Sequence, residues 1–370
     1  MRLIDQYVNQ RIDNKKSNMN ATIIKYLLIS SLSFGSFHAI AQDFNANDAA
    51  KIQENARSAM QRGDYSNAIL MFNQAIRLEP NEVSLRRDLA YTYYLSGDAA
   101  KGKTIIDEVI KTDFADEQTF QIAAAIENKL GNGKKANTIL NNGLKKFPQS
   151  ALLYFNRGNQ FLADQKEKNA LENFQQGIAS DPSFASNYLA LAKLIEKTQP
   201  VWAIMYYETF INLEPFTKRS TEAKSGLLGA YKLYFQQNNS GLPSFGGKGK
   251  TTKSENHPFV MMYDQLVNKS VTAITNGVST ESLTMLRTRI ILEWKANYSI
   301  NTPYTLFTYQ DKLLSAGYFD AYNQWLFGAI DNSTTYATWK QANLKLFTDF
   351  EKWINYHPLK PASYDPKPFN

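Results

Sequence analysis

Apolar positions recur along residues 49–216 with a period of 34 residues, and similar side chains return in the same columns. Four copies begin at Ala49, Val83, Glu117 and Ala151, and a fifth copy from Ala185 is one residue shorter. A small residue stands at the eighth position of every copy, in the order Ala56, Ala90, Ala124, Gly158 and Ala192. Because a small residue lets two helices cross closely, each copy predicts a pair of packed helices.

Prolines close the second helix of most copies. They stand at Pro80, Pro148, Pro182 and Pro215. A helix ends near such a residue because proline has no N–H to donate to a continuing turn. Gly102, Phe114 and Gly133 depart from the pattern, which weakens packing locally without shifting the register.

This pattern resembles the tetratricopeptide repeat family, and the resemblance covers about residues 49–216. It implies an all-α fold in which helical hairpins stack into a solenoid, with the first helix of each hairpin lining a concave groove. It also implies a scaffold that binds a protein or peptide partner in that groove.

The family's geometry places ten side chains of this chain toward the groove. They are Arg57, Arg87, Tyr91, Tyr94, Gln121, Asn128, Phe155, Asn156, Asn159 and Lys193. The alternative for each is a solvated side chain or a contact between neighbouring repeats, since few residues of an interface contribute most of its affinity. The set of residues that clamps a C-terminal carboxylate in some family members is not reproduced here, so we do not expect that ligand.

The second half of the chain shows no clear register. Residues 219–236 predict one more helix, either half of a sixth repeat or a cap on the last open face of the stack, so that solenoid and cap together span 42–236. Residues 237–257 predict a flexible linker rich in Gly, Ser and Lys. From residue 258 to 370 we expect a helical domain with a proline-rich tail. Its predicted helices are 259–276, 280–298, 303–316, 318–330 and 334–356.

Aromatic residues are dense in this second half. Trp339, Asn343, Leu346, Phe350 and Trp353 follow steps of four and three residues, which predicts one buried stripe on a single helix. We interpret the aromatics as core. The alternative is a stacking surface for envelope glycan, for which Tyr318, Tyr322 and Trp325 are the open candidates.

Residues 1–41 are predicted to be removed from the mature chain. Lys25 precedes a short apolar stretch, and Ala39-Ile40-Ala41 form a small-residue cleavage site before Gln42. This layout is typical of a secretory signal peptide that begins at Met19, so residues 1–18 are interpreted as a misassigned start. The alternative is an uncleaved anchor. We expect a periplasmic protein of a Gram-negative bacterium.

Composition argues against several other classes of function. The net charge of +7 is small for a chain of 370 residues, so no nucleic acid partner is expected. Cysteine is absent and only three histidines exist, which disfavours a metal site or a Ser-His-Asp triad. Gly249-Lys250-Thr251 resemble the end of a phosphate-binding loop, but Ser244 stands where the motif needs glycine, so no nucleotide is expected.

The acidic residues of the second half are scattered singly, and we name no catalytic residue and no cofactor. Glu293, with Arg287 and Arg289 upstream, looks the most buried, and we interpret it as an internal ion pair. The sequence therefore predicts a binding scaffold and not an enzyme. A glycan-binding module in the second half and an unrecognised hydrolase remain the alternatives.

Overall fold

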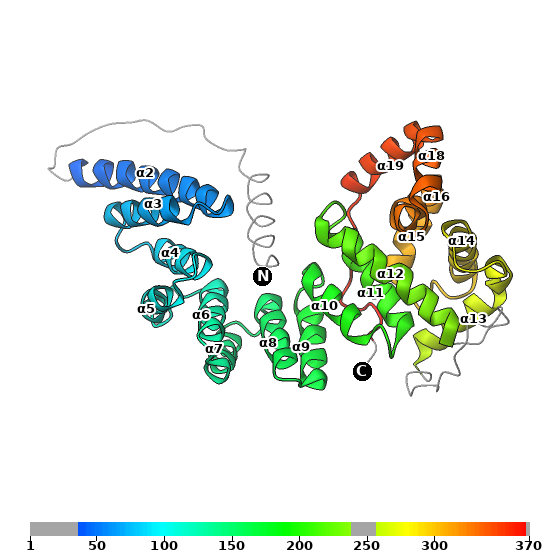
Figure 1. The fold of residues 1–370 in the computed structure, drawn as a ribbon, viewed down its shortest axis with the longest axis horizontal. Helices are drawn as coiled ribbons and strands as arrows, with labels where there is room; N and C mark the ends of the chain where they lie inside the picture. The colour runs from blue at the N-terminus through cyan, green and yellow to red at the C-terminus, as the bar shows by residue number, and fades with distance from the viewer. Residues whose placement is uncertain (1–35, 238–256, 368–370) are drawn as a thin grey trace, which may run out of the picture. The chain divides into compact units, whose positions relative to one another are not determined.

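The computed structural model describes residues 36–237 and 257–367, with the side chains of 36–46 left aside. The described residues form helices and connecting turns and contain no β-strand. The chain divides into two compact units, residues 1–148 and 149–370, which are treated separately below (Figure 1). The predicted all-α class is confirmed.

From residue 36 onward, the first unit consists of three consecutive helical hairpins (Figure 1). Their helices are α2 (Ser36–Gln61), α3 (Tyr65–Leu78), α4 (Val83–Leu95), α5 (Ala99–Val109), α6 (Glu117–Lys129) and α7 (Gly133–Lys146). Each helix packs on its hairpin partner, and α2–α5 also contact the next hairpin of this unit, as in a helical repeat array. The 34-residue register of the sequence is therefore the register of the hairpins.

Short turns with fixed chemistry join the helices of each hairpin. Gly63, Gly97 and Gly131 take φ of 81°, 95° and 81°, a left-handed backbone that favours glycine. The carboxylates of Asp64 and Asp98 then cap the second helices by accepting from the N–H of Asn67 and Lys101. These Gly-Asp pairs set the tight reversal in the first two hairpins.

The second unit begins with two further hairpins and a single helix. The helices are α8 (Ala151–Ala163), α9 (Glu167–Ser180), α10 (Ala185–Ile195), α11 (Pro200–Leu213) and α12 (Lys218–Gln237). Gly158 shows why the eighth position of a repeat is small, because a Cβ there would collide with the Phe174 ring of the partner helix. Phe174 is itself fully buried.

The remaining helices of the second unit pack around α11 and α12. They are α13 (Pro258–Ser270), η2 (Val271–Ile274), α14 (Thr280–Asn297), α15 (Thr305–Ser315), α16 (Phe319–Asn323), the π-helical turn η3 (Gln324–Gly328), α17 (Ala329–Asp331), α18 (Ser333–Ala342) and α19 (Leu344–Tyr356). Contacts join α11 to α13, and α12 to both η3 and α17. The C-terminal helices and the last repeats thus share one core.

This grouping differs from the predicted domains. The sequence predicts two domains, residues 42–236 and 258–370, joined by 237–257, without deciding whether they pack together. The compact units instead divide after Pro148, and the second unit joins α8–α12 to the C-terminal helices. Residues 238–256 lie outside the described residues, as does all of the predicted signal segment except residues 36–41, which begin α2.

The aromatic residues of the second half are mostly core. Phe307, Tyr322, Phe327, Phe347 and Phe350 are each at most 2% exposed. The predicted single helix over 334–356 is wrong, because the helix is interrupted at Asn343 between α18 and α19. Trp339 and Trp353 therefore lie on different helices and are only half-buried.

Candidate functional site

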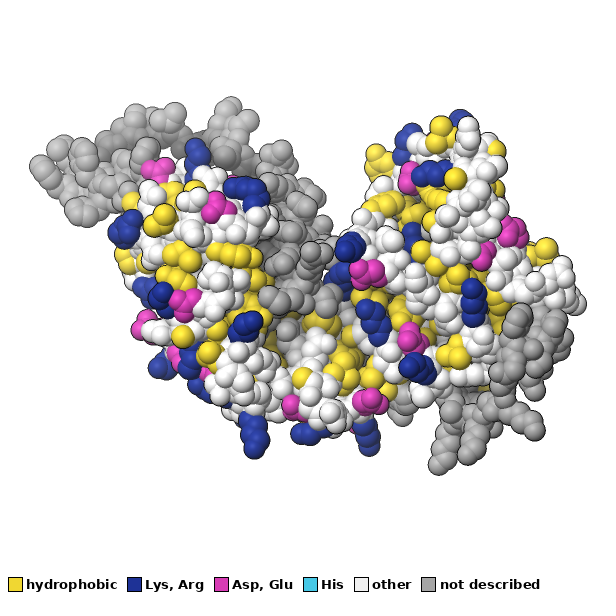
Figure 2. Space-filling view, viewed as in Figure 1, with side chains coloured by type: hydrophobic (Ala, Val, Ile, Leu, Met, Phe, Trp, Pro, Cys, Tyr) yellow, Lys and Arg dark blue, Asp and Glu magenta, His cyan; other side chains and the backbone are white. Residues whose placement is uncertain are grey.

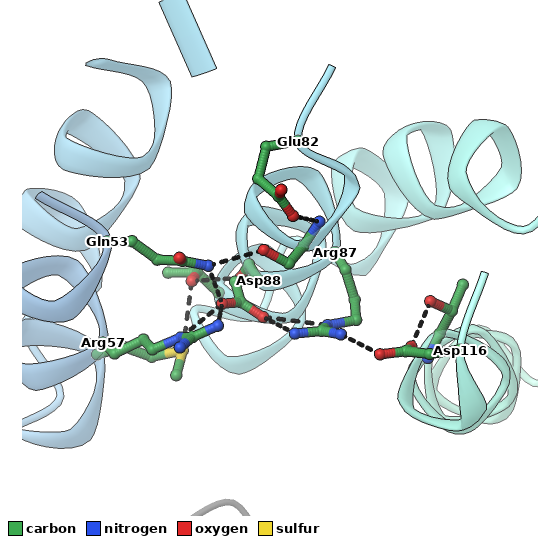
Figure 3. Close-up of polar contacts among 10 residues, drawn as sticks. Gln53, Arg57, Glu82, Arg87, Asp88 and Asp116 are labelled. Atoms are coloured by element: carbon green, nitrogen blue, oxygen red, sulfur yellow. Dashed lines mark hydrogen bonds and ion pairs between the residues drawn. The ribbon is translucent and has the colours of Figure 1, made fainter. Parts of the chain in front are cut away.

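The first helices of the three N-terminal hairpins, α2, α4 and α6, are joined by a row of charged and amide side chains. We call this row the ladder and define it as Gln53, Arg57, Arg87, Asp88 and Asp116 (Figure 3). Direct contacts between α2 and α4, and between α4 and α6, bring these residues together from successive repeats.

Asp88 on α4 is the centre of the ladder. Its Oδ2 accepts from Arg57 Nε at 2.7 Å and from Gln53 Nε2 at 3.1 Å, both on α2 (Figure 3). Gln53 Nε2 also donates to Ser84 Oγ at 3.1 Å. Arg57 remains 29% exposed while Asp88 is 11% exposed, so this end of the ladder reaches the surface.

Arg87 extends the ladder to the third hairpin. Its guanidinium donates to Asp88 Oδ1 through Nη2 at 3.1 Å, and through Nη1 to Asp116, which precedes α6. Asp116 also caps α6 by accepting from the Thr119 N–H at 2.9 Å. Burial alone would lower the pKa of Arg87, but the carboxylates of Asp88 and Asp116 raise it above its ordinary value.

The predicted groove residues of the first unit differ in how far their side chains are exposed to solvent. Tyr91 is 5% exposed and Gln121 is 6% exposed, so both belong to the packed interior. Tyr94 is half-buried and stacks on Tyr91 with ring centroids 6.0 Å apart and planes 14° apart. Asn128 is exposed at the end of α6. Arg57, Tyr94 and Asn128 therefore present the solvent-facing part of the predicted set.

The predicted groove residues of the second unit also divide into two kinds. Phe155 is 7% exposed and packs on Phe174 and Phe184, with ring centroids 6.1 Å and 5.8 Å away. Asn156 donates to the Leu152 carbonyl oxygen at 2.7 Å, within its own helix. Asn159 and Lys193 are exposed. Phe155 serves as core, and whether the exposed residues bind a partner stays a prediction.

Asp88 and Asp116 were not among the predicted residues, although the sequence carries a signal for them. Arg57 and Asp88 are 31 residues apart, and Arg87 and Asp116 are 29 apart. Both separations are close to one repeat, so charges of opposite sign near one period apart indicate contacts between neighbouring hairpins. A search for such pairs would have found the ladder.

A second charged cluster lies in the core of the second unit. Glu208 on α11 forms an ion pair with Arg287 on α14, and Glu208 Oε1 also accepts from Gln310 at 2.6 Å and Tyr322 at 2.7 Å. Glu208 and Arg287 are 1% and 2% exposed, so no substrate reaches them. This cluster joins the repeats to the C-terminal helices.

The ion pair predicted at Glu293 takes a different form. Glu293 is half-exposed and pairs with Lys269, whereas Arg287 turns inward to Glu208. Among the described residues, no group of three or more histidine and acidic side chains could hold a metal ion. Within the same residues, no helix has the length and apolar character needed to cross a membrane.

Comparison with known proteins gives one family match and several distant relatives. Residues 59–126 match the tetratricopeptide repeat family. Protein O-mannosyl-transferase TMTC1 of Homo sapiens is 23% identical over 161 residues, which cover 42% of this chain. The match covers 18% of TMTC1, so this chain spans less than a fifth of that relative.

Two solved structures resemble parts of the chain. TTC0263, a thermophilic TPR protein of Thermus thermophilus, is 16% identical with a TM-score of 0.43, covering 49% of this chain and 99% of its own. The pilF protein of Pseudomonas aeruginosa is 16% identical with a TM-score of 0.42, covering 53% of this chain and 86% of its own.

Proposed function

We propose that this chain, which contains tetratricopeptide repeats, is a scaffold that holds a protein or peptide partner on the first-helix face of its N-terminal hairpins. The observation that carries the proposal is Tyr94, a half-buried ring held in place by its stack on buried Tyr91. A rigid aromatic side chain is typical of a residue that contributes strongly to binding, and exposed Asn128 stands at the equivalent position of the next repeat, 34 residues later.

The charges of the ladder favour one kind of partner. Two arginines, Arg57 and Arg87, face two carboxylates, Asp88 and Asp116, so the row has no formal charge left over. Figure 2 shows basic side chains, and fewer acidic ones, interspersed among uncharged side chains on the face in view. A partner that docks through aromatic and amide contacts fits this surface better than one that presents a free carboxylate.

The charged groups of both units favour a binding role over catalysis. The buried Glu208–Arg287 pair has no access to solvent, and the ladder's acidic groups are held in ion pairs. The activity of TMTC1 is not carried over, because the match covers 18% of that protein. Two of the candidates for glycan stacking, Tyr322 and Trp325, are 0% and 7% exposed.

The test uses two neighbouring tyrosines that are both half-buried. Tyr94→Ala removes the ring stacked on Tyr91, whereas Tyr93→Ala removes a ring that contacts Lys101 on α5, with Nζ 5.6 Å from the ring centroid. Quantitative mass spectrometry after affinity capture should show partners reduced at least about five-fold for Tyr94→Ala alone. Equal capture by the wild type and both variants would reject this face as the docking site.

We further propose that the chain is exported, with cleavage after Ala41. The support is the layout of residues 19–41, in which a lysine, a short apolar stretch and small residues follow one another. Cleavage would remove residues 36–41 from the start of α2. Intact mass and N-terminal sequencing of the protein from envelope fractions should find a chain that begins at Gln42. A chain that begins at Met1 or Met19 would reject export by cleavage.

A further inference from the structure

The C-terminal segment of the chain folds back onto the last repeats of the second unit. We call residues 359–367 the tail. Its residues Pro361, Ala362, Asp365, Pro366 and Lys367 enclose a small cavity of about 10 Å³ together with side chains of the repeats and the start of α15. The other lining residues are Ile178, Tyr188, Tyr206, Thr209 and Tyr304. The tail is thus a short proline-containing peptide seated on an aromatic surface.

One carboxylate fixes the tail in place. Asp365 Oδ1 accepts from the N–H of Thr305, the first residue of α15, at 2.8 Å. Asp365 Oδ2 accepts from the Ala362 N–H at 3.0 Å, and the Asp365 N–H donates to the Ala362 carbonyl oxygen at 3.1 Å. These bonds close a turn in the tail and cap α15 from outside. Leu359, at 4% exposed, supplies the apolar anchor.

The tail leaves a buried polar group of the surface beneath it without a hydrogen bond to any described residue. Tyr206 is 3% exposed and lines the cavity, and its hydroxyl has no hydrogen-bond partner among the described residues. A buried donor without an acceptor is unfavourable by comparison with one that is paired. Tyr364, at the turn of the tail, is 69% exposed and contributes little to the contact. The tail therefore fits the site incompletely.

We propose that this surface of Tyr188, Tyr206 and Tyr304 is a binding site for a proline-containing segment of a partner protein, and that the tail occupies it in the absence of that partner. The partner segment carries an aspartate between prolines, which takes the place of Asp365 at the first turn of α15. It also carries a polar acceptor that reaches the Tyr206 hydroxyl. Extended proline-containing peptides suit aromatic grooves because they lose little conformational entropy on binding.

Competition between the tail and a free peptide is the measurable consequence. While the tail is docked, a peptide in solution sees only the fraction of molecules whose site is open, and its apparent affinity falls by that fraction. A variant that releases the tail should bind the same peptide more tightly. The site lies in the second unit, so this proposal does not depend on docking at Tyr94 in the first.

The experiment measures binding of a fluorescent peptide with the sequence of residues 359–367 to the full-length chain by fluorescence anisotropy. Asp365→Ala in the chain removes the two hydrogen bonds that the Asp365 carboxylate accepts from Thr305 and Ala362, and Tyr364→Ala is the matched control at an exposed position of the same turn. We expect Asp365→Ala to bind the peptide on the order of ten-fold more tightly than the wild type or Tyr364→Ala. The peptide with alanine in place of its aspartate should not bind.

Three outcomes would overturn the proposal. They are equal affinity of the peptide for all three chains, no binding to Asp365→Ala when its tryptophan fluorescence matches the wild type, and unchanged binding when Tyr188→Ala is added. Concentration-dependent dimers of the wild type, seen by light scattering and abolished by Asp365→Ala, would instead assign the site to the tail of a second copy. Such dimers would overturn the partner segment as its ligand.

Discussion

The two units place their charged residues in opposite ways. In the first unit, the ladder runs along neighbouring first helices and stays partly open, with Arg57 29% and Asp116 46% exposed. In the second unit, Glu208 and Arg287 are 1% and 3% exposed by side chain and are enclosed by aromatic residues. Arg287 lies over the rings of Phe319, Tyr322 and Phe327.

The first unit leaves part of its charged row exposed to solvent, whereas the charged pair of the second unit is buried beneath the C-terminal helices. The C-terminal helices cover α11 and α12, and the contacts of Glu208 hold them there. The first-helix face of the first unit keeps Tyr94 and Asn128 in contact with solvent. Removing one partner of a buried ion pair is costly, whereas the more exposed ends of the ladder, Arg57 and Asp116, contribute little stability.

The largest expected effect follows from breaking the buried pair. Arg287→Met leaves the Glu208 carboxylate buried without its cation, and we expect the second unit to lose about 3–5 kcal/mol in its free energy of unfolding. Urea titration followed by tryptophan fluorescence measures this unit alone, because all five tryptophans lie within it. Arg289→Met, at an exposed arginine of the same helix, is the matched control.

A second variant distinguishes loss of the pair from loss of packing. Arg287→Met combined with Glu208→Gln leaves no buried charge, so it should regain more than half of the lost free energy. A loss below about 1 kcal/mol for Arg287→Met would contradict the role of this pair in joining the repeats to the C-terminal helices.

The next effect tests Glu127, a deeply buried carboxylate among the described residues of the first unit. Glu127 is 2% exposed and pairs with Lys103 and Lys135, and Asn132 donates to its Oε2 at 2.8 Å. Burial alone would raise the pKa of Glu127, but these hydrogen bonds lower it to about 2. The stability that Glu127 contributes is therefore present above its unfolded pKa of 4.5 and is lost as the pH falls toward 2.

We expect Glu127→Gln to weaken the first unit by about 2 kcal/mol at neutral pH. The same variant should also lose part of the acid-induced destabilisation between pH 4.5 and 2. Hydrogen exchange of peptides from α6 measures both effects without contribution from the tryptophan-containing unit. Identical exchange in the variant and the wild type, both at neutral pH and between pH 4.5 and 2, would show that the ion pairs of Glu127 with Lys103 and Lys135 do not stabilise this unit.

Replacing each of the two arginines of the ladder should destabilise the first unit to a different extent, although both arginines bind Asp88. Arg87→Ala removes the bridge between Asp88 and Asp116 and should cost about 1–2 kcal/mol. Arg57→Ala leaves Asp88 paired with Arg87 and should cost less than about 1 kcal/mol. Hydrogen exchange across α4 and α6 compares the two variants directly. A larger effect from Arg57→Ala would mean that the exposed end of the ladder holds it together.

The smallest expected effect is a gain in stability of the second unit when Lys224 is replaced. Burial against Trp325, whose ring centroid is 3.8 Å from Nζ, lowers the pKa of Lys224 to about 7, while Glu351 opposes the shift. The unfolded pKa is 10.5, so the unfolded state binds more protons and the second unit becomes more stable as pH rises from 7. Lys224→Met should raise the melting temperature by about 2–4 °C at pH 7 and flatten its rise to pH 9.

The gain from Lys224→Met has a clear counter-outcome. A lower melting temperature at pH 7, measured by tryptophan fluorescence, would mean that the contact of the ammonium group with Trp325 outweighs its loss of hydration. Lys232→Met, at an exposed lysine of the same helix, should change neither the melting temperature nor its pH dependence.

The parts of the fold that were predictable are local in sequence. The hairpins follow from a 34-residue register because each pairs neighbouring helices, and Gly158 shows the steric reason for one of its columns. The ladder was also within reach, since its pairs lie 31 and 29 residues apart. A periodic sequence carries such contacts because every repeat meets the next in the same way.

The contacts that were missed join residues far apart. Arg287 and Glu208 are separated by 79 residues, and Asp365 reaches Thr305 over 60 residues. No period relates such positions, so sequence alone did not reveal that the C-terminal helices and the tail pack on the repeats. Tyr91 and Phe155 were assigned to the groove by position, yet their rings fill the interior because large side chains at that face also pack between helices.

Site-specific photo-crosslinking tests most directly whether partners dock on the first-helix face of the first unit. A benzophenone amino acid replaces Tyr94 in one chain and Tyr93 in the other, and the cells are irradiated before purification. We predict that position 94 yields covalent adducts with a partner polypeptide and position 93 yields at least about five-fold fewer. Equal adducts at the two positions, or adducts at position 93 alone, would contradict docking on this face.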